Sequence, residues 1–233
     1  MKFDFHIHSG LSACAEKVMS PRQFLKRAKE KGLDVIAITD HNASANVRLS
    51  IELSAEFDLR VIPGMEVCTS EDIHMLALFE KCPELADFQA LVDEKLPPGE
   101  NPVEIFGYQI IYDKDDEIVD IDDKLRQIGI TLDMNRLISE IKSRNGVVIA
   151  SHVFREKFSL TSQLGFIDSS AGFDALEISA RQWVNEKYSA GKRISGYPVI
   201  TSSDAHFLDF VGKIYMEIES KTKNLHEIIK SLK

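Results

Sequence analysis

Two histidines separated by one residue, His6 and His8, follow the first apolar stretch of the chain. Residues 3–7 have the composition of a β-strand, in which the side chains at positions i and i+2 point to the same side. The two imidazoles therefore aim at one point, and imidazole is a common metal ligand. The pair predicts half of a metal site, although two exposed histidines on an edge strand would give the same pattern.

Further candidate ligands stand next to later apolar runs. Six of the seven histidines have this placement, and carboxylates accompany them. One histidine beside an apolar strand is more often a polar residue satisfied by the protein itself. Six of them, joined by carboxylates, predict a metal site that holds several ions. The set consists of His6, His8, Asp40, His41, Glu66, His74, His152, Asp204 and His206.

The mixture of imidazole and carboxylate ligands narrows the choice of ion. It suits Zn²⁺, Mn²⁺ or Fe²⁺ and disfavours Ca²⁺. Five or more histidines exceed what one tetrahedral ion uses, so we expect two or three divalent ions. Neighbouring ions suit phosphoester hydrolysis, because they lower the pKa of a bound water to give hydroxide and offset charge on the phosphate.

Strands and helices that must position these residues alternate along the chain. After the strand at 3–7 we expect strands at 34–38, 60–67, 74–79, 146–150, 174–178, 197–201 and 214–218, and helices at 21–31, 43–57, 83–96, 134–144, 162–167, 185–192 and 225–232. The alternation predicts an α/β fold with a parallel sheet, closed as a barrel of about seven units. The carboxyl ends of the strands would then bring the candidate ligands to one face.

Two features qualify this expectation. His74 precedes its strand, so it needs a different path to that face. An open doubly wound sheet is the alternative, but it usually begins with a glycine-rich turn after its first strand, where this chain has His-Ile-His-Ser.

The stretch at 97–123 interrupts the alternation and begins with Pro97-Pro98-Gly99. We expect a β-hairpin there, with strands at 104–111 and 117–119 around an acidic turn at 113–116. The stretch is too short to bury a core of its own. We therefore interpret 1–233 as a single barrel domain with a small inserted hairpin, which lies on the barrel or acts as a lid.

Composition limits the partners. The chain of 233 residues has a formal net charge of −9, which argues against a general nucleic-acid or membrane binder. A small phosphorylated substrate remains compatible, because bound metal ions reverse the local field. Three cysteines indicate a reducing compartment rather than a disulfide framework. With no signal peptide ahead of the first strand and no apolar run long enough to span a membrane, we expect a cytoplasmic protein.

The ordered motifs resemble the polymerase and histidinol phosphatase (PHP) domain over almost the whole chain. This resemblance implies a distorted (β/α)7 barrel that holds up to three divalent ions and hydrolyses phosphate esters. The motifs are His6-Ile7-His8-Ser9, Thr39-Asp40-His41, Gly64-Met65-Glu66, His74, Ser151-His152 and Asp204-Ala205-His206.

The same resemblance implies which ligands share an ion. His6, His8, Glu66 and Asp204 would hold the first ion. Glu66 would bridge to a second, held also by His74 and His152. His41, His206 and a ligand from the loop after His8 would hold the third.

The loop ligand is where this chain departs from the family pattern. Many relatives have an aspartate in the loop, and here the stretch reads Ser12-Ala13-Cys14-Ala15-Glu16. Cys14 stands at a spacing from His6 where some relatives place a ligand, and a thiolate would favour zinc or iron. Cys14 could equally be a small buried residue, and Glu16 is a weaker substitute.

Residues beside the ligands supply candidates for catalysis and substrate binding. We assign a catalytic role to Asp40, His41 and Arg155, with Asp40 orienting an imidazole or a water, unless it caps a helix. Arg155 and Arg181 are candidates for binding the substrate phosphate, because arginine binds phosphate bidentately. For both arginines a solvated surface position is the alternative.

Three further residues carry weaker signals. Glu177 ends a strand on the expected active face, but the sequence gives it no role. Phe154 and Trp183 could stack on a base, although core packing is the more frequent use of an aromatic side chain.

These features together predict a metal-dependent phosphoesterase in which metal-bound hydroxide attacks a small phosphate ester, such as a nucleotide or a sugar phosphate. A short oligonucleotide also fits, and the oligomeric state is open. A hydrolase of amides or lactones on a similar metal barrel is one alternative, since a fold does not determine a function. A non-catalytic, regulatory metal-binding domain is the other, and the nearly complete ligand set favours the enzyme.

Overall fold

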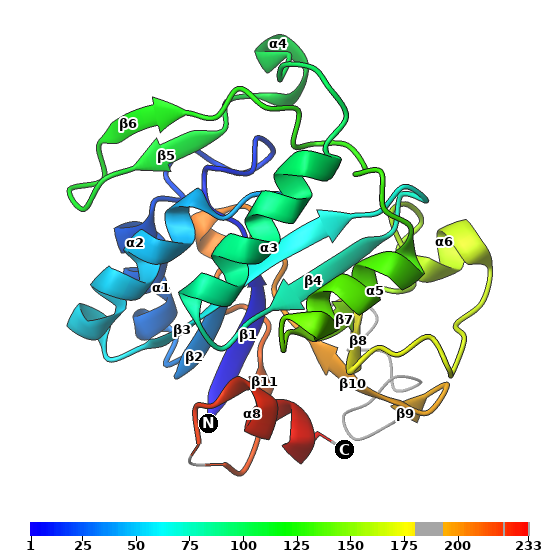
Figure 1. The fold of residues 1–233 in the computed structure, drawn as a ribbon. Helices are drawn as coiled ribbons and strands as arrows, with labels where there is room; N and C mark the ends of the chain where they lie inside the picture. The colour runs from blue at the N-terminus through cyan, green and yellow to red at the C-terminus, as the bar shows by residue number, and fades with distance from the viewer. Residues whose placement is uncertain (180–192, 221, 233) are drawn as a thin grey trace.

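The computed structural model describes residues 1–179, 193–220 and 222–232 (Figure 1). Its main sheet has the strand order β11-β1-β2-β3-β4-β7-β8-β10-β9. A parallel bridge between Ile7 and Ala205 joins the end of β1 to the segment that follows β10. The sheet therefore curls into a nearly closed barrel, and the expected distorted α/β barrel is confirmed.

The barrel strands are short and almost wholly buried, as expected for strands covered on both faces. They are β1 (Lys2–Ile7), β2 (Val35–Ile38), β3 (Arg60–Cys68), β4 (His74–Leu78), β7 (Val147–Ala150), β8 (Ala175–Ile178) and β10 (Tyr197–Thr201). Two strands extend the sheet at its edges, β9 (Arg193–Ile194) and β11 (Met216–Glu217).

Helices surround the strands, and the buried apolar residues form two clusters on opposite sides of the strands. They are α1 (Pro21–Glu30), α2 (Ala45–Ser54), α3 (Cys82–Lys95), α5 (Met134–Ser143), α6 (Leu160–Leu164) and α8 (Leu225–Ser231). In β2, Ile36 and Ile38 belong to the core shared with α1, α3 and α5. Val35 and Ala37 belong instead to a second core shared with α8, which lies beside the amino-terminal end of β1 (Figure 1).

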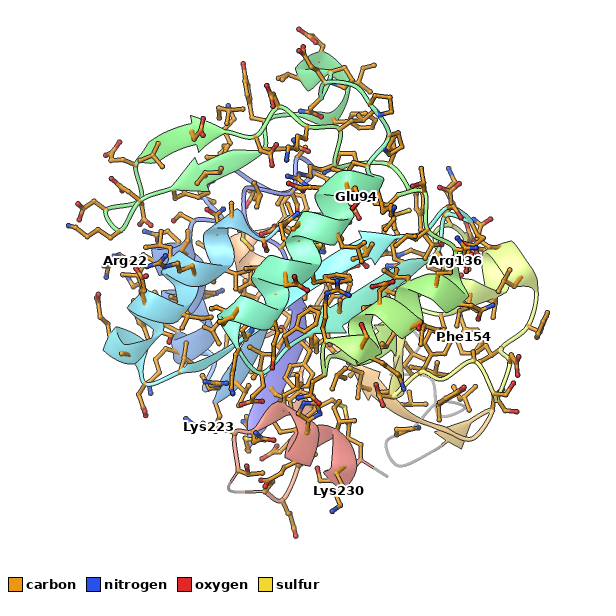
Figure 2. All side chains as sticks on the ribbon, in the orientation of Figure 1. Arg22, Glu94, Arg136, Phe154, Lys223 and Lys230 are labelled. Atoms are coloured by element: carbon orange, nitrogen blue, oxygen red, sulfur yellow. The ribbon has the colours of Figure 1, made fainter. Side chains whose placement is uncertain are left out.

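Helix α1 illustrates how the sequence specifies these elements. Pro21 begins the helix, where its missing N–H is not needed, and Phe24, Leu25 and Ala28 form its buried face. Charged side chains lie on the opposite faces of the helices, as Glu94 of α3 and Arg136 of α5 show (Figure 2).

Strand β4 runs opposite to the other barrel strands. It is antiparallel to both β3 and β7, so the expectation of a wholly parallel sheet is wrong at this point. The connection at residues 69–73 is too short for a crossover, which needs about a dozen residues. The reversal pairs His74 with Cys68, and thereby places the first residue of β4 at the carboxyl end of β3.

The insertion contains a helix as well as the expected hairpin. Strands β5 (Ile110–Tyr112) and β6 (Ile118–Ile121) form a separate two-stranded sheet. Helix α4 (Val103–Phe106) occupies part of the predicted strand at 104–111, which is a correction. The side chain of Asn46 in α2 donates to Ile110 O and accepts from Tyr112 N, at 2.9 and 3.2 Å, and so attaches the hairpin to the barrel.

Near the carboxyl terminus, the predicted strand at 214–218 is the short β11, which is antiparallel to β1. Strand β9, which pairs with β10, was not expected. The predicted helix at 185–192 lies outside the described residues. In the part of the chain that the structure describes, none of the helices combines the length and apolar character that a membrane crossing requires.

Candidate metal centre

Glu66, in β3, lies at the centre of the predicted ligand set. Its Oε1 is 3.3 Å from His6 Nε2, 3.2 Å from His74 Nδ1 and 3.3 Å from His152 Nε2. Its Oε2 is 3.1 Å from His41 Nδ1. Residues from β1, β2, β3, β4 and β7 thus meet around one carboxylate that is 1% exposed.

Asp204, which follows β10, is the second carboxylate of the cluster. Its Oδ1 lies 3.4 Å from the Nε2 atoms of both His6 and His8, which are themselves 3.1 Å apart. The same oxygen is 3.5 Å from His206 Nδ1. The structure therefore brings together all the nitrogen and oxygen ligands that the sequence predicted for metal binding.

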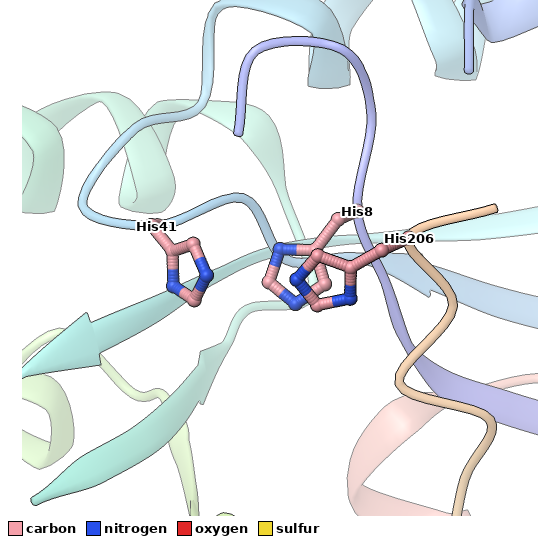
Figure 3. A group of neighbouring side chains, drawn as sticks. All are labelled: His8, His41 and His206. Atoms are coloured by element: carbon pink, nitrogen blue, oxygen red, sulfur yellow. The ribbon is translucent and has the colours of Figure 1, made fainter. Parts of the chain in front are cut away.

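Among the residues that the structure describes, three groups of ligand atoms are compact enough to hold an ion, with all atoms in a group within 4.8 Å of one another. Figure 3 shows one of them, in which three imidazoles from separate loops converge. The groups are His8, His41 and His206; His6, His8 and Glu66; and His41, Glu66 and His74.

The cluster also contains buried polar atoms that have no hydrogen-bond partner among the described residues. Glu66 Oε1, Asp204 Oδ1, His74 Nδ1 and His152 Nε2 are all of this kind. Buried polar atoms without a partner are rare, and here Glu66 Oε1 lies 3.2 Å from His74 Nδ1 and 3.3 Å from His152 Nε2. Such a donor set fits divalent cations.

Two ligands are held in an unusual backbone conformation. His152 has a φ of 29° and Asp204 a φ of 49°. Non-glycine residues seldom adopt positive φ, and such strained residues persist where the surrounding structure imposes them, often at functional sites. The strain supports a site that is built to aim these two side chains.

The pKa values of the carboxylates follow from their neighbours. Burial alone would raise the pKa of Glu66, but the surrounding imidazoles of His74, His6, His152 and His41 hold that pKa well below its usual range. Burial likewise opposes ionisation of Asp204, and His6 and His8 overcome it and lower that pKa. Both carboxylates are therefore held in the charged form, which is the form that binds a divalent ion.

The thiol of Cys14 faces the cluster from the loop after β1. Burial would raise its pKa, but hydrogen bonds with His206 and His41 lower the pKa to about 6. Glu16, the weaker candidate, has its carboxylate engaged otherwise, because the carboxylate accepts a hydrogen bond from Leu208 N at 3.4 Å. Of the two loop candidates, only Cys14 is placed to join His41 and His206.

Asp40 is set behind the cluster rather than in it. It accepts hydrogen bonds from Ser9 N, Ser9 Oγ and Ser12 Oγ, each at 2.7 Å. Ser12 Oγ in turn lies 2.9 Å from His8 Nδ1. Asp40 can therefore orient the His8 imidazole through Ser12, a residue to which sequence reasoning gave no role.

Glu177, which the sequence left without a role, touches two ligands. Its Oε2 is 2.9 Å from His6 Nδ1 and accepts from His152 N at 3.3 Å. This contact turns His6 Nε2 toward the cluster, as carboxylates commonly do for metal-binding histidines. Its position at the end of a barrel strand was the only signal in the sequence.

The predicted substrate-binding residues divide into two groups. Arg155 lies at the cluster, where its guanidinium forms an ion pair with Asp204 Oδ2. Arg181 and Trp183 lie outside the described residues. Phe154 is half-buried and packs against the main core rather than facing the cluster.

Two cavities open beside the cluster, and both are lined by Arg155 and His206. One has a volume of about 320 Å³ and is lined also by His152, Glu177, Asp204 and Phe207. The other, of about 240 Å³, is lined by Cys14, His41, His74, Arg126 and Phe158, among others. A phosphate bound at Arg155 would have room for a substituent on either side.

Comparison with known proteins agrees with this arrangement. The family model of the PHP domain matches residues 4–231. An uncharacterised protein of Methanocaldococcus jannaschii is 34% identical over 112 residues, which cover 45% of this chain and 58% of that protein. A 5′-3′ exoribonuclease of Haemophilus influenzae is 32% identical over 84 residues, 34% of this chain and 30% of that protein.

Among solved structures, the lesion-specific endonuclease EndoQ of Pyrococcus furiosus has the same fold. It superposes with a TM-score of 0.70 at 18% sequence identity, over 99% of this chain and 55% of that chain. The chain thus spans less than two thirds of each of these three proteins.

Proposed function

The chain belongs to the PHP domain family, and from this premise we propose that it is a metal-dependent phosphoesterase. The observation that carries the proposal is the convergence of six imidazoles on Glu66 and Asp204, with several of their buried atoms lacking partners among the described residues. Two or three ions of Zn, Mn or Fe suit this set of ligands.

Each residue of the site has a part in the proposed reaction. His6, His8, Glu66 and Asp204 would hold one ion; Glu66, His74 and His152 a second; and Cys14, His41 and His206 a third. When bound, such ions supply positive charge to phosphate oxygens and lower the pKa of a coordinated water.

The protein residues outside the ligand set bind and orient. Arg155, on Asp204, would bind a phosphate oxygen through its guanidinium. Glu177 and the Asp40–Ser12 pair would keep His6 and His8 in the orientation that presents Nε2 to the ions.

For the substrate we propose a small phosphate ester, a nucleotide or the end of a short oligonucleotide. Cavities of about 320 and 240 Å³ and the net charge of −9 support a small ligand over a long nucleic acid. The exoribonuclease relative supports the oligonucleotide, as does Endonuclease Q, which binds a duplex with an abasic lesion at its active site. We also propose a cytoplasmic location, which the free thiols of Cys14, Cys68 and Cys82 support.

The test combines metal analysis with a substrate panel. We expect the purified protein to contain Zn, Mn or Fe and to hydrolyse at least one of a set of nucleotides, sugar phosphates and short oligonucleotides, with cyclic amides and lactones as the comparison. Glu66→Gln should lose bound metal and at least about 100-fold in kcat/KM, since metal catalysis contributes several kcal/mol.

His226→Gln is the matched control. His226 is the seventh histidine and lies in α8, outside the cluster, so this variant should keep its metal and its activity. A protein that binds no transition metal, or that turns over amides and no phosphate ester, would overturn the proposal.

A further inference from the structure

Two phenylalanines are exposed directly beside the metal ligands. Phe207 follows His206, and Phe210 ends the short 3-10 helix Leu208–Phe210. Their exposed fractions are 47% and 48%. Aromatic side chains contribute most to stability when buried, so an exposed pair beside a functional site indicates a surface that a ligand covers.

Both rings line the cavity of about 320 Å³ that opens on the cluster. The same cavity is lined by His152, Asp204 and Arg155, so the aromatic wall and the phosphate-binding guanidinium face a common space. The ring centroids of Phe207 and Phe210 are 5.9 Å apart and their planes are inclined by 56°. The pair offers an aromatic corner rather than a flat stack.

A buried hydroxyl faces the same cavity. Ser202 is 2% exposed, and its Oγ has no hydrogen-bond partner among the described residues. A buried polar atom without a partner is uncommon in folded proteins. A polar group of a ligand in this cavity would satisfy it.

Two positively charged side chains lie among or beside the residues that line this cavity. Arg155 lines the cavity, and the ammonium of Lys213 lies 4.1 Å from the centroid of the Phe210 ring. An aliphatic sugar phosphate would use the cations but not the aromatic corner. A planar heterocycle attached to a phosphate uses both, because every base has a face that stacks on an aromatic ring.

We propose that Phe207, Phe210 and Ser202 form a subsite for the nucleobase of the ester whose phosphate lies at the ion cluster. The substrate is then a nucleotide, either free or at the end of a short single strand. This inference rests on the proposed phosphoesterase function and deepens it, because it assigns residues to base binding and thereby favours a nucleotide over a sugar phosphate.

The test compares a substrate that has a base with one that lacks it. Adenosine 5′-monophosphate and ribose 5-phosphate carry the same phosphate, and a short oligoadenylate gives the strand-end arm. We expect Phe207→Ala and Phe210→Ala to lower the ratio of kcat/KM for the base-containing substrate to that for ribose 5-phosphate about tenfold, mainly through KM. Ser202→Ala should lower the same ratio to a smaller extent.

Phe166→Ala is the matched control, because Phe166 is 63% exposed and lines neither cavity. A second measurement uses adenosine, which has no phosphate, as a competitor of ribose 5-phosphate hydrolysis. We expect competition in the wild type and in Phe166→Ala, and weaker competition in Phe207→Ala. Metal content and circular dichroism verify that the variants fold and hold their ions.

The possible failures are distinguishable. If the wild-type protein hydrolyses no phosphate ester, the proposed function fails. If it hydrolyses both substrates, but the ratio is the same in Phe207→Ala, Phe210→Ala and Phe166→Ala, only the base subsite is overturned. If Phe207→Ala and Phe210→Ala lower the kcat/KM ratio measured with adenosine 5′-monophosphate, the substrate is a free nucleotide. If they lower only the ratio measured with the oligoadenylate, the substrate is the end of a strand.

Discussion

At the scale of single residues, Glu66 holds the candidate site together. Its two oxygens face five imidazoles at 3.1–3.6 Å, and it is 1% exposed. A charged carboxylate at this depth is costly unless positive charge surrounds it. The histidines supply that positive charge when they are protonated. When the histidines act as ligands, divalent ions supply it instead, so Glu66 links burial, charge and metal binding.

Cys14 gives a residue-scale prediction about the number of ions. Its thiol faces His41 and His206, the two imidazoles proposed for the third ion. Cys14→Ser should lower the metal content by one ion per chain and leave the ions at Glu66 in place, because a neutral hydroxyl is a poor substitute for a thiolate. Cys14→Asp should restore the ion and shift the preference from zinc toward manganese.

Native mass spectrometry with metal analysis measures the stoichiometry. Cys82→Ser provides the control, since Cys82 lies at the start of α3, away from the cluster. An unchanged ion count in Cys14→Ser would remove the thiol from the site.

Residue types and their placement predicted the side chains that cluster at the candidate site, but not the residues that orient them. His6, His8 and Glu66 are recognisable because histidines and carboxylates recur beside several apolar strands of this chain, and both are common metal ligands. Ser12 and Glu177 are ordinary residues in the sequence, and Glu177 meets His6 across 171 positions of chain. Their roles depend on the fold that brings them to the candidate ligands, and no local sequence pattern indicates these roles.

At the scale of elements, the pairing of β3 with β4 sets the distance between ligands. Gly64 opposes Leu78 in this ladder, and Glu66 and His74 follow in the same pair of strands. A Cβ at Gly64 would lie 2.7 Å from Leu78 Cδ2 and 3.1 Å from Ile38 O. The absent side chain therefore allows β2, β3 and β4 to approach closely where the ligands begin.

Gly64→Ala tests this close packing. Overpacking of this kind costs about 1–3 kcal/mol of the free energy of unfolding, and the shift of β3 should weaken metal binding as well. Thermal unfolding and a chelator competition assay measure the two effects. Gly165→Ala is the comparison: its Cβ meets nothing within 4 Å, so only the strain at φ +79° should appear, with metal affinity intact. Equal metal affinity in Gly64→Ala and the wild type would contradict the argument.

Elements were predictable where local pattern and tertiary role agree. The apolar runs of β2 and β7 and the amphipathic face of α1 were enough to predict these elements. Helix α4 was not predicted, because its Val-Glu-Ile-Phe sequence favours a strand locally and the surrounding insertion decides its conformation. The short connection before β4 indicates its reversed direction, but the prediction rested on the alternation of strands and helices and did not use the length of that connection.

At the scale of the whole molecule, the barrel closes where the ligands lie. His8 N donates to Ala205 O at 3.0 Å, and Ala205 N donates to His6 O at 3.3 Å. Ala205 stands between Asp204 and His206. The backbone contacts that join β1 to the segment after β10 therefore connect residues that carry, or lie next to, the candidate ligands. The proposed metal site and the closure of the barrel between β1 and the segment after β10 therefore depend on neighbouring residues.

This coincidence predicts that removal of metal loosens the whole barrel. Ions that bind the folded chain and not the unfolded one stabilise it by mass action, by about 2.7 kcal/mol when the free ion is at 100 times its Kd. For a chain of this length that corresponds to a fall in Tm of roughly 5–10 °C on chelation. Differential scanning calorimetry with and without chelator should show this fall, and added Mn²⁺ or Zn²⁺ should reverse it. The fall in Tm on chelation should be full in His226→Gln and absent in Glu66→Gln. An unchanged wild-type Tm after a measured loss of bound metal would show that the ions do not stabilise the closed barrel.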